Sequence, residues 1–384
     1  MTYKNYLSRK ILKNKFNFIP LVILILAVLI CLAFNVRNKA ANSYLIDTKN
    51  DIRQGKQALH DSQSDLKRKN ESAAARKIDK TNIADEKRDI KTNQLILNRV
   101  HGRQWRAAYK QKIILIKQDL KVSLNSKGSG TGLIKAMKRD LLIYQDLAKK
   151  NLEKQDDDFP TQGIGYSVWV SKTILPYLLV LSIIFVLVQI YGDAFEGKLN
   201  KNNLLPISKK TVISENITSG SIFSIGTLII TELIALMAGW TVSGVGALNY
   251  PYLSYAVGSG KMELKNISDL ILPSLLLQCL AIVFIIELTY FIVTLVRNRL
   301  ASLFITLLLT IGVVLMTSVV EPIQRIAQFL PTTYVNGISV VSGQYGQSIA
   351  NYHLSFSTGL LTLIPSIMIF YLLIVFVNTK LLKF

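Results

Sequence analysis

Six long apolar runs constrain the fold of this chain more than any other feature. They cover residues 18–34, 168–190, 217–240, 271–296, 300–320 and 356–377. A helix needs about 20 mostly apolar residues to cross the hydrocarbon core of a bilayer. Prolines in or beside these runs do not exclude helices, because neighbouring helices re-satisfy the carbonyls that proline frees. The sequence therefore predicts an all-α polytopic membrane protein with six transmembrane helices.

The first run has a second interpretation, a cleaved signal peptide, because basic residues precede it. No small-x-small cleavage site follows, since the run ends in Asn35-Val36-Arg37. Cys31 also lacks the small preceding residue of a lipoprotein signal. We therefore expect the first run to remain as an uncleaved anchor.

Charge divides the chain into three parts. Residues 1–36 carry 5 basic and no acidic side chains, whereas residues 37–165 carry 28 basic and 16 acidic ones. Residues 166–384 hold only 12 basic and 8 acidic side chains, and the whole chain has a net charge of +21. We expect a cytoplasmic N-terminus with helix 1 in the first part and a charged domain in the second. The third part is then a transmembrane domain that holds helices 2–6.

The short loops predict the orientation, because cytoplasmic loops are enriched in Lys and Arg. With the N-terminus inside, the inner segments hold 13 basic residues and the short outer loops hold 3. Long loops are exempt from this rule, so residues 37–165 do not alter the count. This predicts a multi-pass protein of the cell (plasma) membrane with both termini cytoplasmic and residues 37–165 extracytoplasmic, as an insertion between helices 1 and 2.

The inserted domain has the composition of long helices, and residues 56–101 contain no glycine or proline. Apolar residues recur every seven positions at Leu45, Ile52, Leu59, Leu66 and Ala73. A strict coiled coil fills two positions per heptad, so we expect a coiled-coil-like helical domain. The 56–101 run forms either one helix of about 70 Å or a hairpin that turns near Asn70 or Asn82.

The charge of this domain allows two interpretations. The simpler one, which we favour, is a rigid helical hairpin with a solvated surface. The other is a basic stalk that handles an anionic or amphipathic ligand, or the cell-wall polymer. Nucleic acid is not an expected partner, because the domain is predicted to lie outside the membrane and lacks interleaved aromatic residues.

Several kinds of site are disfavoured by the sequence. Cys31 and Cys279 both lie in apolar runs, so neither a disulfide framework nor a Cys-based zinc site is expected. The three histidines are scattered and do not form a metal site. Residues 258–261 read Gly-Ser-Gly-Lys, but they lack the spacing and the Ser or Thr of a phosphate-binding loop. We therefore expect no metal, no cofactor and no enzymatic activity of this chain on its own.

Two acidic residues lie inside apolar runs, Glu232 in the third and Glu287 in the fourth. A carboxylate in hydrocarbon is costly unless it is paired or protonated, so both are candidate functional residues. One interpretation is a proton or cation relay. The interpretation that we favour is hydrogen bonding between helices or contact with a water-filled vestibule. The predicted topology places Glu232 in the outer half and Glu287 in the inner half, so we expect no pairing within one subunit.

The predicted cytoplasmic loop 191–216 has an acidic start, an amphipathic middle, a proline and a basic end. This pattern predicts a short helix on the inner face that docks into a partner's groove, with Pro206 at its start. A plain solvated loop is the alternative. The candidate coupling residues are Asp193, Glu196, Gly197, Leu204, Leu205, Pro206, Ile207, Ser208, Lys209 and Lys210.

Two stretches resemble ABC-2-type exporter permeases. Glu196-Gly197 followed by residues 205–209, Leu-Pro-Ile-Ser-Lys, is similar to an element after their second span, although Lys198 stands where threonine is frequent. Residues 329–337, Phe-Leu-Pro-Thr-Thr-Tyr-Val-Asn-Gly, are similar to a stretch before the last span of bacteriocin and antimicrobial-peptide exporters. Sodium-type and peptide-type members also carry a large insertion after span 1. The candidates for an outer re-entrant or gating segment are Pro331, Tyr334, Asn336 and Gly337.

The resemblance implies that two permease subunits, identical or different, pair in the lipid bilayer and that each receives a separate cytoplasmic ABC ATPase. ATP-Mg binds to that partner, and closure of the ATPase moves the loop and switches a cavity from inward to outward access. The exported substrate would be a peptide or an amphipathic, toxic compound.

Two other functions remain open. One is a membrane sensor or interaction protein whose outer hairpin binds a ligand. The other is a proton- or cation-coupled secondary transporter that uses Glu232 and Glu287.

The predicted topology can be tested by cysteine labelling in intact cells, after Cys31 and Cys279 have been replaced. A membrane-impermeant thiol reagent should label a single cysteine at Ser129 and should not label one at Lys209. Labelling at Lys209 without labelling at Ser129 would show that the orientation is the reverse.

Overall fold

The computed structural model of the chain describes residues 7, 13–41, 44–66, 73–125, 130–196, 199–201 and 206–381. Within these ranges, six helical stretches are long and apolar enough to cross a membrane. They are Lys15–Leu66, Leu175–Gly192, Lys209–Ser243, Ile267–Val296, Arg299–Val319 and Phe356–Thr379. The prediction of a mainly helical chain with six helices long and apolar enough to cross a membrane is confirmed.

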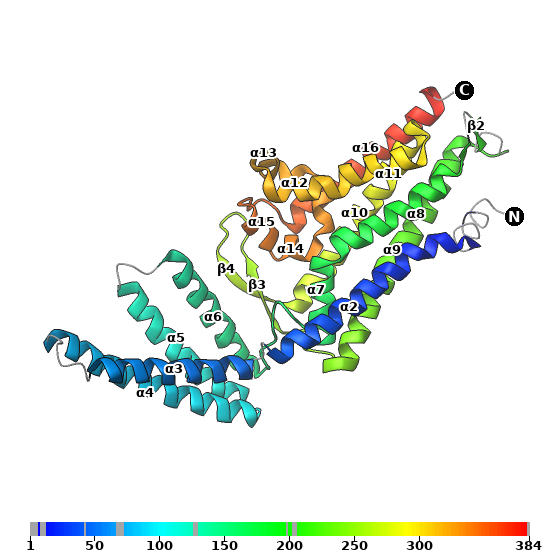
Figure 1. The fold of residues 1–384 in the computed structure, drawn as a ribbon. Helices are drawn as coiled ribbons and strands as arrows, with labels where there is room; N and C mark the ends of the chain where they lie inside the picture. The colour runs from blue at the N-terminus through cyan, green and yellow to red at the C-terminus, as the bar shows by residue number, and fades with distance from the viewer. Residues whose placement is uncertain are drawn as a thin grey trace. The chain divides into compact units, whose positions relative to one another are not determined.

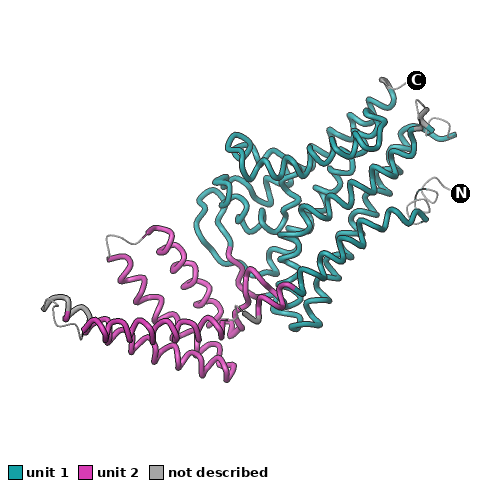
Figure 2. Tube along the Cα trace, viewed as in Figure 1, with its two compact units in different colours: residues 1–33, 161–248, 254–384 teal, residues 34–160, 249–253 magenta. Residues whose placement is uncertain are grey.

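The chain divides into two compact units, which Figure 2 shows in different colours. The membrane unit contains residues 1–33, 161–248 and 254–384, and it holds the apolar helices. The charged unit contains residues 34–160 and 249–253, so it takes in most of the predicted insertion. Each unit has its own hydrophobic core.

The membrane unit is built from the following elements, labelled in Figure 1. The first span is η1 (Lys15–Phe18) with α2 (Ile19–Ala41), and the second is α7 (Gly163–Thr173), η2 (Leu175–Leu179) and α8 (Val180–Gly192). The third and fourth are α9 (Lys209–Ser243) and α10 (Ile267–Val296). The fifth is α11 (Arg299–Leu307), η4 (Leu308–Gly312) and α12 (Val313–Val319), and the sixth is α16 (Phe356–Phe376) with η7 (Val377–Leu381). Between the last two lie α13 (Glu321–Ile326), η5 (Ala327–Phe329), η6 (Pro331–Val335), α14 (Gly337–Val341) and α15 (Gln344–Ser348).

Helix α10 is the centre of the membrane unit. It contacts α8, α9, α11, α14, η6 and α16. Its sequence is apolar on every side, and buried residues follow one another without a break from Phe284 to Tyr290. A helix that is apolar all round is stable only when other apolar groups enclose it. The surrounding spans supply that enclosure, so α10 fixes where the other helices pack.

The second span is a helix with one widened turn, whereas the sequence predicted a uniform helix over 168–190. The widened turn is η2, a π-helical segment that contains Pro176. Proline has no N–H to donate, and its ring crowds the preceding turn. A π-type turn accommodates the ring without ending the helix. The span therefore continues through Pro176 from Gly163 to Gly192.

The charged unit consists of four helices that pack in sequence order. They are α3 (Tyr44–Leu66), α4 (Ala73–His101), α5 (Trp105–Asn125) and α6 (Thr131–Lys150). Helix α3 packs along α4, α4 contacts α5, and α5 packs along α6. The unbroken helix over 56–101 is therefore wrong, and the hairpin alternative is correct. Asn82 lies inside α4, and the connection that holds Asn70 lies outside the described residues.

The hairpin has a physical cause in the sparse apolar pattern of its helices. One apolar residue per heptad does not stabilise a long solvated helix, but it can be buried when the chain folds back on itself. Ile52 on α3 is buried, and Ile96 on α4 is fully enclosed. Gly55 allows the close approach, since a Cβ at that position would lie 3.0 Å from Cγ1 of Ile90.

Aromatic rings extend the core of the charged unit between its helices. The ring centroids of Tyr44, Tyr109 and Tyr144 lie 5.5 to 5.8 Å from one another. Burial raises the pKa of each of these three phenols, so their hydroxyl groups stay neutral at physiological pH. Arg106 holds the end of α6 nearby, because its guanidinium donates to the carbonyls of Ala148 at 3.1 Å and Lys149 at 3.0 Å.

Two short hairpins, which the all-α prediction missed, complete the described fold. Strand β1 (Phe195–Glu196) pairs antiparallel with β2 (Leu199–Asn200), and β3 (Pro251–Tyr255) pairs with β4 (Met262–Asn266). The Gly-Ser-Gly-Lys stretch is the turn between β3 and β4. Gly258 and Gly260 have φ of +78° and +61°, which only glycine adopts without strain. The glycines therefore allow the chain to turn between β3 and β4.

Substitution of Gly55 distinguishes the hairpin from a single helix. Gly55→Leu should lower the stability of the chain by about 1–3 kcal/mol, because the added side chain enters a filled contact with Ile90. The measurement is thermal unfolding of the purified chain followed by circular dichroism.

Gly132→Leu is the matched control, because Gly132 lies in α6 with nothing within 4 Å of an added Cβ. That variant should be neutral or more stable, since glycine is the poorer helix former by about 1 kcal/mol. If Gly55→Leu also stabilised the chain, α3 and α4 would not pack as described.

Candidate functional site

The predicted coupling loop lies at one end of the membrane unit. Figure 1 shows the start of α2, strand β2 and the end of α16 at that same end. Four described residues of the loop form the β1–β2 pair, in which Phe195 pairs with Asn200 and Glu196 with Leu199. The predicted helix is therefore wrong at Glu196, Leu199 and Asn200. The candidates Gly197, Leu204 and Leu205 lie outside the described residues.

The end of the loop also differs from the prediction. Pro206 and Ile207 precede the helix, and α9 begins at Lys209 with Ser208 as its N-cap. The hydroxyl of Ser208 accepts a hydrogen bond from the backbone N–H of Thr211 at 3.1 Å. A serine side chain satisfies a free N–H of the first turn, which a proline ring cannot do. The third span therefore starts eight residues before the predicted Ile217, and the loop is correspondingly shorter.

Lys209 and Lys210 consequently occupy the first turn of α9. Positive side chains are unfavourable there, because the N-terminal end of a helix carries positive partial charge. Lys209 offsets part of this cost by donating from Nζ to the carbonyl oxygen of Asn378 in η7, at 3.2 Å. The start of the third span is thereby tied to the end of the sixth.

Asp193 ties the other side of the loop to the fifth span. Its Oδ1 lies 2.5 Å from Nη2 of Arg299, and Nη1 of Arg299 lies 3.5 Å from Oε1 of Gln189. Gly192 leaves room for this arginine, since a Cβ there would lie 2.7 Å from its Cγ. Sequence analysis selected Asp193 but missed Arg299 as its partner.

A local turn brings Arg299 to this position. Arg297 adopts the left-handed conformation with φ of +54° and ends α10. Asn298 then caps α11 by accepting from the N–H of Ala301 at 3.1 Å. The charged stretch 297–299 therefore reverses the chain between two spans and presents one guanidinium to Asp193.

A second set of polar contacts crosses the interior of the membrane unit. Glu232 on α9 accepts a hydrogen bond from the hydroxyl of Ser167 on α7. One turn further along α7, Ser171 accepts from Nε2 of Gln278 at 2.9 Å. The same amide nitrogen donates to the carbonyl of Val335 at 3.3 Å. These contacts link α9, α7, α10 and η6. They agree with the favoured interpretation, in which Glu232 forms hydrogen bonds between helices.

Glu287 is in a different environment from Glu232. Its side chain is 2 % exposed, and no described residue hydrogen-bonds to its Oε2. Neither acid forms an ion pair with any residue that the structure describes. An unpaired polar atom in an apolar interior is costly, so Glu287 remains a candidate functional residue.

The Pro331–Gly337 motif is a buried packing segment. Pro331 begins η6, and Tyr334 is fully buried and donates from its hydroxyl to the carbonyl of Gln328 at 2.7 Å. Asn336 is also buried. A Cβ at Gly337 would lie 2.5 Å from the carbonyl oxygen of Ser274 on α10. The motif therefore needs a glycine for close contact with the central helix, and its role as a gate stays a prediction.

Lys172 is a polar residue of the membrane unit that sequence analysis missed. Its Nζ donates to Oε1 of Gln344 on α15 at 2.7 Å. The signal was available, because a lysine inside the apolar run 168–190 is unusual. Its partner was not predictable, since the two residues are 172 positions apart.

Comparison with known proteins identifies no relative, because no family model, no curated protein and no solved structure matches this chain. The geometry of the 191–216 loop and of the polar contacts inside the membrane unit therefore carries the functional interpretation.

Proposed function

We propose that this chain is the membrane-spanning permease subunit of an ATP-driven ABC exporter. A separate ATPase subunit binds at the 191–216 loop, and a second permease subunit completes the transporter. The observation that carries the proposal is the pair of anchors on that loop. Asp193 contacts Arg299, and Lys209 contacts Asn378.

These anchors connect one surface loop with the ends of four spans. Asp193 follows the second span and Lys209 begins the third, while Arg299 begins the fifth and Asn378 ends the sixth. A displacement of the loop would therefore pull on helices across the unit. Coupling between a nucleotide site and a transport path needs such a contiguous physical connection.

The charge at the start of α9 supports a contact with an anionic partner. Lys209 and Lys210 both lie against the helix dipole, which is a local cost to folding. A partner surface that carries carboxylates would offset this cost, as would lipid phosphates. We assign the loop to the cytoplasmic side on the count of basic residues, so both termini are cytoplasmic and the charged unit is extracytoplasmic.

The polar interior supports a path for a substrate that is not purely apolar. Ser167, Ser171, Glu232 and Gln278 join three helices by side-chain contacts within the membrane unit. Breaking and remaking such contacts provides two discrete helix arrangements, which alternating access requires. The exported substrate is then a peptide or an amphipathic compound.

ATP hydrolysis takes place on the partner subunit in this proposal. The sequence holds no nucleotide-binding motif, and the only similar stretch is the β3–β4 turn. ATP-Mg therefore binds to the ATPase, and this chain supplies the path and the coupling loop.

A membrane sensor is the second candidate function, because the charged unit contains a large cleft of its own. A proton- or cation-coupled secondary transporter is weaker. It would use Glu232 and Glu287, which lie in separate environments without an ion pair between them.

The partner contact can be tested at the loop itself. Leu205→Asp and Glu196→Lys should abolish co-purification of the ATPase and substrate export while leaving membrane insertion intact. An unpaired aspartate at an apolar contact costs several kcal/mol, which removes most complex at micromolar affinity.

Val257→Asp and Glu263→Lys are the matched controls, since they make the same changes at the β3–β4 hairpin. Val257 is 58 % exposed, and Glu263 pairs with Lys265 at 3.1 Å. Retention of the ATPase and of full export by both loop variants would contradict the proposal.

The anchor itself can be tested by a double-mutant cycle of Asp193→Ala and Arg299→Ala. Each single variant should bind the ATPase but lower export, because the connection to the fifth span is lost. The double variant should be no worse than either single one, since both remove the same ion pair. Partly exposed ion pairs contribute only about 0–1 kcal/mol to stability, so protein amounts should not change. Additive losses of export would show that the pair is not the connection.

A further inference from the structure

The charged unit contains a cleft of about 890 Å³ that the proposed transport mechanism does not use. Its walls come from the end of α2, the start of α3, the turn between α4 and α5, helix α6 and the segment 153–159. Clefts of roughly 300–1,000 Å³ are typical of small-molecule sites, in which a few polar groups converge beside apolar walls. The lining of this cleft has both features.

The segment that forms one wall is held by buried anchors. The backbone N–H of Lys154 donates to the hydroxyl of Tyr109 at 2.7 Å, and that of Gln155 donates to the hydroxyl of Tyr250 at 3.0 Å. Further along, the amide of Asn35 donates to the carbonyl of Pro160 at 3.0 Å. The wall is therefore fixed at three points, and its side chains are positioned before any ligand arrives.

Aromatic rings form the apolar part of the cleft. Tyr44, Trp105 and Phe159 line it. Tyr44 and Trp105 are held from behind by Tyr109, whose ring centroid lies 5.7 Å and 6.2 Å away. The hydroxyl oxygen of Tyr44 is buried and has no hydrogen-bond partner among the described residues. This wall offers the faces of aromatic rings to a ligand.

Carboxylates converge on the same cleft. The five acids in its lining are Asp47, Glu153, Asp156, Asp157 and Asp158. Asp156 is occupied, because its Oδ1 accepts from the backbone N–H groups of Asp158 and Phe159 at 2.9 and 3.1 Å. The other four make no ion pair with a residue that the structure describes. The lining holds five carboxylates and four Lys or Arg side chains, and this excess of negative charge favours a positive ligand.

The basic residues of the cleft fall into two groups. Nζ of Lys154 lies 5.1 Å from the ring centroid of Tyr144 and 3.3 Å from its hydroxyl, and Arg139 pairs with Asp140 at 3.0 Å. These two cations are engaged, and Lys154 shows that the aromatic cluster already holds a cation on a ring face. Lys39, His101 and Arg103 also line the cleft. The test below therefore includes an anionic probe.

We propose that this cleft binds an organic cation with an apolar group, with its ammonium or guanidinium among the carboxylates of residues 153–158 and its apolar part against Trp105 and Tyr44. Aromatic faces and carboxylates together form the usual protein environment for such cations. The proposal does not rest on the exporter function, because the cleft belongs entirely to the charged unit.

The test uses three probes with one aromatic ring and different charge. They are benzyltrimethylammonium, neutral benzyl alcohol and anionic benzenesulfonate. Binding to the detergent-solubilised full-length chain is measured by saturation-transfer NMR over a concentration series. The cation should saturate and bind at least roughly tenfold more tightly than the other two probes, as expected for combined cation–π and carboxylate contacts.

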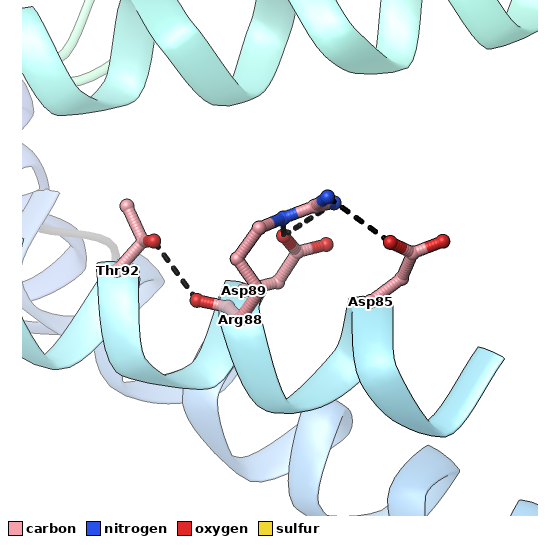
Figure 3. A network of polar contacts seen from close by, with 4 residues as sticks. All are labelled: Asp85, Arg88, Asp89 and Thr92. Carbon is pink, nitrogen blue, oxygen red and sulfur yellow. Dashed lines mark hydrogen bonds and ion pairs between the residues drawn. The ribbon is translucent and has the colours of Figure 1, made fainter. Parts of the chain in front are cut away.

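Two double variants separate the cleft from the general charge of the unit. Asp157→Asn with Asp158→Asn removes two carboxylates from the cleft wall. Asp85→Asn with Asp89→Asn removes two from the surface of α4, where each carboxylate pairs with Arg88, at 3.0 and 3.2 Å. Figure 3 shows these three side chains. The variants have the same change in net charge, and any binding of probe to detergent is the same for both.

The cleft variant should weaken binding of the cation roughly tenfold, and the surface variant should leave it unchanged. Equal binding by both variants would overturn the proposal. Preferential saturation by benzenesulfonate would also overturn it, because the cleft would then be an anion site of its basic residues. The same holds if no probe saturates on the unmodified chain.

Discussion

The requirement that every backbone polar group be satisfied within hydrocarbon governs the membrane unit. A hydrogen-bonded helix meets it within one segment, and polar side chains can bond to the same backbone. The hydroxyls of Thr289, Thr294 and Thr306 do so by donating to carbonyls one turn earlier, at 2.6 to 2.8 Å. Pro176 interrupts the regular hydrogen-bond pattern of the helix. A widened, π-helical turn accommodates it and keeps the helix continuous.

The proposed function depends on polar contacts that join one helix to another. Glu232 with Ser167 and Gln278 with Ser171 join helices inside the core. Asp193 with Arg299 joins them at the end where the coupling loop lies. Polar contacts between helices have specific geometry, whereas apolar packing tolerates sliding. A small number of such contacts can therefore define discrete helix arrangements, which an exporter needs and which a passive membrane anchor does not.

The charged unit is stabilised by the apolar and aromatic side chains that its helices bury between them. Its helices are too polar to be stable alone, so α3 folds back on α4 and a cluster of tyrosines fills the space between helices. Two tyrosine hydroxyls fix the segment 153–159 by accepting from its backbone N–H groups, and the side-chain amide of Asn35 donates to the carbonyl of Pro160 that follows it. The aromatic residues therefore stabilise the unit and also form one wall of its cleft, so the same side chains serve the core and the proposed binding site.

The sequence alone determined the number and nature of the spans, because hydropathy is a local property that a run of about 20 residues expresses by itself. It also placed Asp193, Lys209 and Glu232 among the candidate residues. Tertiary structure decided their partners, since Arg299, Asn378 and Ser167 are distant in sequence and share no pattern with them. It decided the start of α9 as well, where Ser208 rather than Pro206 supplies the capping oxygen. The α3–α4 hairpin depended on it too, because a sparse apolar stripe becomes stable only when a second helix covers it.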